Sequence, residues 1–282
     1  MKCIFTIDVE DWFHILDLPS TPKISEWKSL ESHVEKNFNR LLGIFEKHNV
    51  QATCFFLGWI AEQYPHLVLE AQNKGHEIAS HGYAHELVYT QTEQDFFEDA
   101  VKAINILENI TGNKVTGYRS SGFSVTEDTP WFFDKLLEAG YRYDSSVFPA
   151  KRGHGGLQSV QKGPHTVDRK QGKLLEFPIT VKDVFGKPVC FFGGGYLRIF
   201  PYPVIKRMAG KVLQDERPVI FYIHPREIDP KHPRLPMNMK RRFKSYVNLD
   251  TTEKKIHRIL EDFEFTTFEQ YYRNNSAEYG LT

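Results

Sequence analysis

Short apolar runs alternate along the chain with segments in which apolar residues recur at helical spacing. Residues 2–7, 52–57 and 219–223 are runs rich in β-branched and aromatic side chains, which is typical of buried strands. A helical stripe lies between the first two runs and is formed by Val34, Phe38, Leu41, Leu42 and Phe45. We therefore expect the first strand to be followed by an amphipathic helix and then by a second strand.

The same alternation continues toward the end of the chain. Thr92 has the features of an N-cap, with Asp95 in the first turn, and Gly112 is expected to end the helix between them. The other expected elements are strands at 75–80 and 141–143 and helices at about 127–139, from Pro201 and Pro203 onward, and at about 252–263. This order of strands and helices predicts an α/β fold with a parallel sheet.

Two stretches do not follow the alternation. Residues 145–173 are rich in Gly, His, Lys and Pro without periodicity, and residues 191–198 combine three glycines with aromatic side chains. We expect both to be loops, and loops held on a rigid scaffold commonly carry binding groups.

An acidic cluster closes the first predicted strand. Asp8, Glu10 and Asp11 follow an otherwise apolar run, and carboxylates this close need a cation or an arginine to offset their charges. Because side chains alternate along a strand, Asp8 and Glu10 are expected on one face and Asp11 on the other. We expect Glu10 to bind a metal ion and Asp8 to act as a base, with Asp11 as the alternative ligand.

Two histidines at i and i+4 supply further metal ligands. If residues 81–85 form the first turn of a helix, His81 and His85 lie on one face about 5–6 Å apart, within reach of one ion. Chance alone produces such a pair easily among twelve histidines. The strand predicted at 75–80 changes this interpretation, because it places the pair at a strand's carboxyl end, where barrel enzymes build their sites.

Two more segments complete a chemically complementary set. Arg119 follows a short predicted strand, and His224 follows the strand at 219–223, which places it at the same end of the sheet. The chain thus offers one carboxylate and two imidazoles for a divalent metal, a second carboxylate as base, an arginine to hold that base and a histidine as acid. This set predicts a metal-dependent amide hydrolase.

These motifs together resemble those of polysaccharide deacetylases of carbohydrate esterase family 4. Within the family the chain is most similar to the branch found in bacterial exopolysaccharide gene clusters. The resemblance covers nearly the whole chain and rests on the ordered segments TIDVEDWFH, ATCFFLGWIAEQYP, GHEIASHGYAHELVY, ITGNKVTGYRSSGFS, EAGYRYDSSVFP, FGGGYLRIFPY and FYIHPREIDPKHPR. It implies the NodB-homology fold, a distorted, incomplete (β/α) barrel of about seven strands.

The resemblance also implies a role for each candidate residue. It assigns Asp8 as catalytic base and Arg119 as the residue that orients it, with His224 as general acid. It implies that one divalent metal ion, zinc or alternatively cobalt or nickel, is held by His81, His85 and either Glu10 or Asp11. The family's arginine is usually followed by a proline, whereas Ser120, Ser121 and Gly122 follow here, so the backbone donor to the oxyanion is sought near Ser121.

The implied substrate is an N-acetylated amino sugar of cell-surface polysaccharide or exopolysaccharide biosynthesis, linked to a nucleotide, to a lipid or within an oligosaccharide. Trp12, Phe13, Phe123 and Tyr196 are candidates for stacking on its ring, and Asp144 is a candidate for orienting His224 or a loop. Two alternatives stay open. One is a metal-dependent hydrolase of ureides or imides, and the other is a carbohydrate-binding protein on the same fold without catalysis.

Composition agrees with one catalytic domain spanning residues 1–282. Thirty-six basic residues balance thirty-six acidic ones, so net charge gives no reason to expect nucleic acid as a partner. No apolar run approaches the length of a membrane span, and a strand predicted from residue 2 leaves no room for a signal peptide, so we expect a cytoplasmic protein. The cysteines, Cys3, Cys54 and Cys190, lie in apolar surroundings typical of reduced, packed thiols. The oligomeric state is not indicated.

Overall fold

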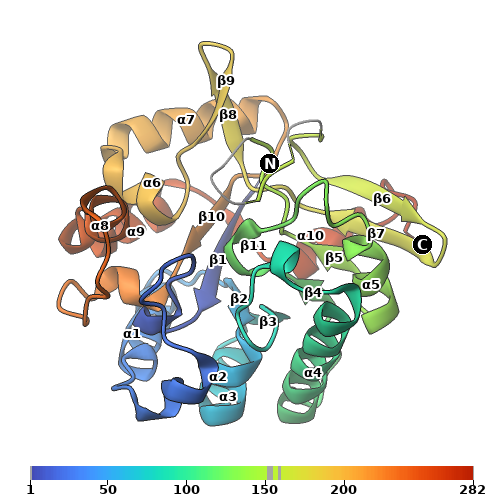
Figure 1. Ribbon diagram of the computed structural model, residues 1–282. Coiled ribbons are helices and arrows are strands. Elements are labelled where there is room, and N and C mark those ends of the chain that lie inside the picture. Colours follow the sequence, from blue (N-terminus) through green and yellow to red (C-terminus); the bar gives the residue numbers. More distant parts are fainter. Residues whose placement is uncertain (1, 151–154, 158–159, 282) are drawn as a thin grey trace.

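A sheet of mostly parallel strands forms the centre of the molecule (Figure 1). The computed structural model describes residues 2–150, 155–157 and 160–281. Within them, seven strands run parallel in the order β10-β1-β2-β3-β4-β5-β7, antiparallel β6 extends the sheet beyond β7, and β11 pairs with β1. The strands of this sheet are β1 (Cys3–Val9), β2 (Thr53–Phe56), β3 (Glu77–Ser80), β4 (Gly117–Tyr118), β5 (Tyr143–Asp144), β6 (His165–Arg169), β7 (Gly172–Glu176), β10 (Ile220–Ile223) and β11 (Phe265–Thr266).

The helices lie around the outside of the strands (Figure 1). A separate hairpin of β8 (Val181–Val184) and β9 (Lys187–Cys190) projects from the body of the molecule. The α-helices are α1 (Val34–Lys47), α2 (Gly58–Gln63), α3 (Pro65–Asn73), α4 (Glu93–Thr111), α5 (Phe132–Ala139), α6 (Gly194–Ile199), α7 (Tyr202–Gln214), α8 (Met239–Tyr246), α9 (Thr252–Asp262) and α10 (Phe268–Asn275).

Strand β1 occupies the middle of the fold. All seven of its residues are buried, because β10 and β2 pair with it on its two sides and helices cover the sheet. Apolar side chains such as Phe5 and Ile7 fill the core between sheet and helices. The strand continues through Asp8 to Val9, two residues further than the sequence predicts. The carboxylate of Asp8 therefore belongs to the strand itself and not to the loop after it. Burial of this strand therefore places its acidic end against the core.

The predicted parallel α/β fold is confirmed, and the sheet is open. The seven parallel strands match the number expected for an incomplete barrel. No pairing between the edge strands β10 and β6 closes the sheet among the described residues. The capping chemistry of α4 is also as predicted, since Thr92 accepts a hydrogen bond from the Asp95 N–H and Gly112 ends the helix with φ 66°.

Four sequence predictions about secondary structure are wrong, and three of them lie outside residues 81–85. The helix expected from about residue 127 begins only at Phe132. The stretch 145–173, expected to be loop, contains β6 and the first residues of β7, which pair as an antiparallel hairpin. Its residues 151–154 and 158–159 lie outside the described part. The stretch 191–198 is not only a flexible turn, because α6 begins at Gly194.

Cys3, Cys54 and Cys190 are buried and unbridged, as predicted. Across the described residues, no helix combines the length and the apolar character that crossing a bilayer requires.

Candidate active site

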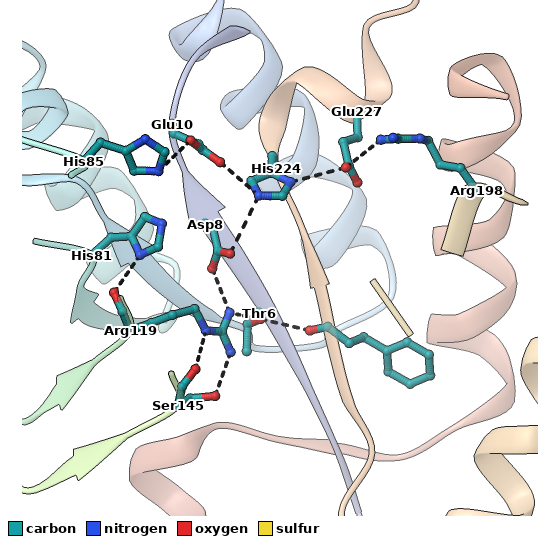
Figure 2. Close-up of polar contacts among 11 residues, drawn as sticks. Thr6, Asp8, Glu10, His81, His85, Arg119, Ser145, Arg198, His224 and Glu227 are labelled. Carbon is teal, nitrogen blue, oxygen red and sulfur yellow. Dashed lines mark hydrogen bonds and ion pairs between the residues drawn. The ribbon is translucent and has the colours of Figure 1, made fainter. Parts of the chain in front are cut away.

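A pocket of about 550 Å³ opens at the carboxyl ends of β1, β3 and β10. It is lined by the residues that the sequence singled out, Asp8, Glu10, His81, His85 and His224. These residues lie up to 216 positions apart in the chain. Parallel pairing of β1 with β2 and β10 brings them together at the carboxyl ends of the strands (Figure 2). These residues therefore lie at the carboxyl ends of the strands, as the sequence predicts.

Glu10, His81 and His85 form a group that can hold a metal ion. One ligand atom from each lies within 4.8 Å of the other two, and all three side chains are buried. Oε2 of Glu10 makes no hydrogen bond although Nε2 of His85 lies 3.0 Å from it. A buried carboxylate oxygen without a hydrogen bond, facing two imidazoles, is the donor set that zinc-like ions prefer, so these residues fit such an ion.

Hydrogen bonding fixes the orientation of His81. Its Nδ1 lies 2.7 Å from the carbonyl oxygen of Arg119, so Nδ1 donates and Nε2 carries the lone pair (Figure 2). Burial lowers the pKa of His81 to about 4, which keeps the ring neutral. A neutral imidazole whose second nitrogen donates to a carbonyl is the usual state of a metal-binding histidine.

The predicted helix at 81–85 is wrong. The segment is a loop in which His85 has φ 56° and Gly82 has φ 72°. The carboxylate of Asp99 on α4 shapes this loop, because it accepts the backbone N–H groups of Tyr83 and Ala84 at 2.7 and 2.8 Å. The two imidazoles still come together, with ring centroids 5.3 Å apart, through loop geometry that spacing alone does not encode.

Asp8 is held by the buried guanidinium of Arg119. Nη1 of Arg119 lies 2.7 Å from Oδ1 of Asp8 and also donates to Oγ1 of Thr6 at 2.7 Å. Ser145 accepts the remaining contacts, at its carbonyl oxygen and its Oγ (Figure 2). The guanidinium also lies over the ring of Phe55, 4.1 Å from its centroid. Arg119 therefore has one fixed position, and it fixes one oxygen of Asp8.

His224 lies on the other side of the two carboxylates. Its Nε2 is 2.9 Å from Oε1 of Glu10 and 3.8 Å from Oδ2 of Asp8. Burial works against its charged form, but the carboxylates of Glu10 and Glu227 outweigh it and raise the pKa of His224 to about 9. Burial likewise opposes ionisation of Glu10, yet His85 and His224 hold its pKa well below the ordinary value. The site thus pairs an ionised carboxylate with a protonated imidazole.

Sequence reasoning missed the partner that orients His224. Nδ1 of His224 lies 3.2 Å from Oε1 of Glu227, and Nη1 of Arg198 lies 2.6 Å from the same oxygen. Glu227 is the third residue after His224, and Arg198 lies in the predicted loop at 191–198. An acid three residues beyond a candidate catalytic histidine is a signal that the sequence contained. The position of Arg198 could not be found in this way.

Asp144, which the sequence offered as a partner of His224 or of a loop, holds a loop. It accepts the Ser146 hydroxyl at 2.5 Å and the Ser146 N–H at 3.0 Å. Glu176 is its neighbour across β5 and β7. Burial raises the pKa of Asp144 to about 6 and that of Glu176 well above its ordinary value, so Glu176 retains its proton at neutral pH.

Asp11, the alternative metal ligand, is used as a cap. Its Oδ2 accepts hydrogen bonds from the Ser32 hydroxyl at 2.7 Å and from the His33 N–H at 2.8 Å. Its Oδ1 accepts the N–H of Trp12 at 2.7 Å. With these donors around it, Asp11 does not face the group of Glu10, His81 and His85.

The aromatic candidates divide into two pairs. Phe123 and Tyr196 line the pocket, and Tyr196 is partly exposed. Trp12 and Phe13 do not line it, because they are buried in the core and pack edge to face against each other.

Two family models match separate parts of the chain. Residues 27–143 match the family model described as polysaccharide deacetylase. This part of the chain is thus similar to a polysaccharide deacetylase domain. Residues 145–273 match a second model, described as a domain of unknown function (DUF3473). The two matched ranges contribute strands to the same sheet.

Individual relatives cover different parts of the chain. A peptidoglycan deacetylase of Helicobacter pylori is 29% identical over 113 residues, which is 40% of this chain and 38% of that protein. The crystal structure of a putative polysaccharide deacetylase from Mycobacterium smegmatis matches with a TM-score of 0.66 at 22% identity, covering 99% of this chain and 91% of that one. The structure of PuuE allantoinase matches with a TM-score of 0.64 at 20% identity, covering 99% and 91%. At these identities the solved structures show the fold alone.

Proposed function

We propose that the protein is a metal-dependent hydrolase that removes the N-acetyl group from an amino sugar. The observation that supports this most directly is that one pocket joins a three-residue ligand group to Asp8, held by Arg119, and to His224. Deacetylase relatives support hydrolysis of a C–N amide bond.

The residues of the chain divide the chemistry between them. A divalent ion held by Glu10, His81 and His85 would supply a Lewis acid that polarises the acetyl carbonyl and acidifies a water molecule. Asp8 accepts the proton of that attacking water, and Arg119 holds Asp8 in place. Because water attacks directly, no serine or cysteine nucleophile is required.

His224 completes the reaction from the opposite side. An amide nitrogen is a poor leaving group until it is protonated, and His224 gives it that proton. Glu227, 3.2 Å from Nδ1, directs Nε2 of His224 toward the pocket. For the oxyanion we propose the N–H of Ser121, because Gly122 beside it lines the pocket and the N–H groups of Ser120 and Phe123 donate elsewhere.

The finer features of this proposal concern metal, substrate and location. Two imidazoles and one carboxylate favour zinc, with cobalt or nickel as alternatives. The substrate proposed is an N-acetylated sugar of cell-surface polysaccharide or exopolysaccharide biosynthesis, attached to a nucleotide or lipid carrier or within an oligosaccharide. We propose that the enzyme works in the cytoplasm.

Acetate release tests the proposal. Purified protein loaded with zinc, cobalt or nickel is expected to release acetate from at least one member of a panel of N-acetylated sugar nucleotides and chitooligosaccharides. Asp8→Asn is expected to lower kcat by about 10²–10⁴ while the metal content stays the same. Asp128→Asn, which changes an exposed aspartate, serves as the matched control.

Two other outcomes would replace the proposal. Hydrolysis of cyclic ureides or imides without acetate release would assign the same site to a different amide. Binding of acetylated sugars without turnover under any metal would leave a carbohydrate-binding protein.

A further inference from the structure

Helix α8 carries two large apolar side chains that are mostly exposed. Met239 is 80% exposed and Phe243 is 59% exposed, one turn apart on the same side of the helix. Tyr246 continues this side into the protein, where its hydroxyl accepts the Leu235 N–H at 3.0 Å. The apolar stripe of α8 therefore begins in the core and runs out to the surface.

The rest of α8 is strongly basic. Its eight residues include Lys240, Arg241, Arg242 and Lys244 and no acidic residue, in a chain whose net charge is zero. Within the described chain, Lys240, Arg242 and Lys244 form no ion pair with a carboxylate, and Arg241 donates to the carbonyl of Leu16 at 2.8 Å. An exposed apolar stripe flanked by unopposed cations is the pattern of a helix that lies in the interface of an anionic membrane.

Buried Arg198 fixes α8 beside the catalytic pocket. Its guanidinium donates to the carbonyls of Lys244, Ser245 and Val247 at 2.8, 3.1 and 3.1 Å, which satisfies the carboxyl end of the helix. Figure 1 shows α8 at the periphery of the molecule, next to α6. Arg198 therefore holds the carboxyl end of α8 in a fixed position on the body of the protein.

The mouth of the pocket continues this surface. Arg241 and Lys244 of α8 line the pocket together with Tyr196 and Ile199 of α6, whose side chains are also exposed. Asp17, like Asp8 and Glu10, lines the same pocket, and together with Arg241 it also lines an adjoining pocket. Basic and apolar groups thus surround one side of the opening to the active site.

We propose that α8 docks the protein on an anionic phospholipid surface and holds the pocket mouth at the level of the headgroups. Met239 and Phe243 enter the interface, while Lys240, Arg242 and Lys244 contact lipid phosphates. An eight-residue helix is only about 12 Å long, so it lies on the bilayer and does not cross it. This docking goes beyond the proposed chemistry and requires no turnover.

Vesicle sedimentation tests the docking. Wild-type protein is expected to sediment with vesicles of phosphatidylcholine containing 30 mol% phosphatidylglycerol at least about tenfold more strongly than with phosphatidylcholine alone, and to dissociate at high salt. The double substitutions Met239→Ser/Phe243→Ser and Lys240→Gln/Arg242→Gln are each expected to weaken binding about tenfold or more. None of these four residues lines the pocket.

Matched controls separate docking from folding and from total charge. Lys36→Gln/Lys47→Gln removes the same charge from exposed positions of α1, and Leu69→Ser removes an exposed apolar side chain from α3. Both controls are expected to bind like wild type, and all variants to keep the wild-type unfolding temperature. Equal binding to neutral and anionic vesicles, no binding to either, or wild-type binding by both α8 variants would overturn the proposal, whatever the outcome of the acetate assay.

Discussion

Oε1 of Glu227 lies 3.2 Å from Nδ1 of His224, on the side of the imidazole that faces away from the carboxylates of the pocket. Burial opposes the charge on Glu227, but Arg198 and His224 outweigh burial and hold the pKa of Glu227 at about 2. The carboxylate is therefore charged throughout the physiological range, and it fixes both the orientation and the proton position of His224.

Glu227→Gln is expected to lower kcat at least tenfold with little change in KM, because a misoriented His224 affects proton donation more than substrate binding. It should also cost about 3–5 kcal/mol of unfolding free energy, since buried Arg198 loses its partner. Steady-state kinetics and urea unfolding measure the two effects. Glu35→Gln is the control, because Glu35 pairs with His66 at 2.9 Å on the exposed surface. This substitution should leave kcat unchanged and alter the unfolding free energy by no more than about 1 kcal/mol. An unchanged kcat in Glu227→Gln would show that His224 needs no positioning carboxylate.

Glu10→Gln, His81→Ala and His85→Ala are each expected to lose bound metal and to remain folded, because each removes one donor from the group of three. Asp11→Asn is expected to keep the metal and to lose about 1–3 kcal/mol of stability, since Asp11 accepts hydrogen bonds from Ser32, His33 and Trp12. Elemental analysis and thermal unfolding give both readouts. The reverse ranking, with metal lost in Asp11→Asn and kept in Glu10→Gln, would move the ligand to Asp11.

Glu77 is expected to make stability depend on pH. It is buried at the start of β3, and burial outweighs its hydrogen bonds from Thr53 and Tyr143, which raises its pKa to about 7. In the unfolded chain its pKa is about 4.5, so between these values the folded state binds more protons than the unfolded state. The unfolding free energy should therefore fall as pH rises from about 4.5 to 7, by roughly 3 kcal/mol from this group.

Glu77→Gln removes that contribution, so the fall in unfolding free energy between pH 5 and pH 8 should be smaller by up to about 3 kcal/mol. Urea unfolding at the two pH values measures it. Glu127→Gln, at an exposed position, should leave the wild-type slope. Parallel pH profiles for wild type and Glu77→Gln would mean that Glu77 titrates alike in the folded and unfolded states.

Gly117→Ala is expected to destabilise the fold by about 1–3 kcal/mol, because a Cβ at this residue of β4 would lie 2.0 Å from the Tyr143 ring, which the fold packs against it. Gly210→Ala provides the opposite control. It lies within α7 with open space around it, so alanine should stabilise the protein by about 0.5–1 kcal/mol. Calorimetry measures both, and equal unfolding temperatures for the two variants would contradict the close packing at Gly117.

The sequence predicted those features that depend on neighbours along the chain. The periodic stripe of α1, the cap at Thr92 and the strand before His224 are local signals, and the structure contains each of them. The conformation at His85 was not predictable, because Asp99, fourteen residues further on, shapes that loop through the N–H groups of Tyr83 and Ala84. In the same way, donors from residues 32 and 33 occupy Asp11, and no spacing within the acidic cluster indicates them.

The long-range pairings of the site were also hidden. Arg198 meets Glu227 across 29 residues, and Arg198 lies in a segment that the sequence predicts to be a loop. The hairpin of β6 and β7 lacks alternating apolar residues because β6 is at the sheet edge and none of its residues is buried. Sequence therefore identified the residues that line the pocket better than the residues that hold them in position.

The position of β1 between β2 and β10 has a consequence for how the protein is made. Ile4 pairs with Ile220, so at about 5–20 residues per second a ribosome needs roughly 10–40 seconds to synthesise the partner of a strand that it produced first. Throughout that interval one edge of an apolar strand is unpaired, and an unpaired apolar edge can pair with another nascent chain. Slow elongation should thus favour aggregation, and a chaperone that covers residues 3–9 until β10 emerges should raise the yield of folded protein.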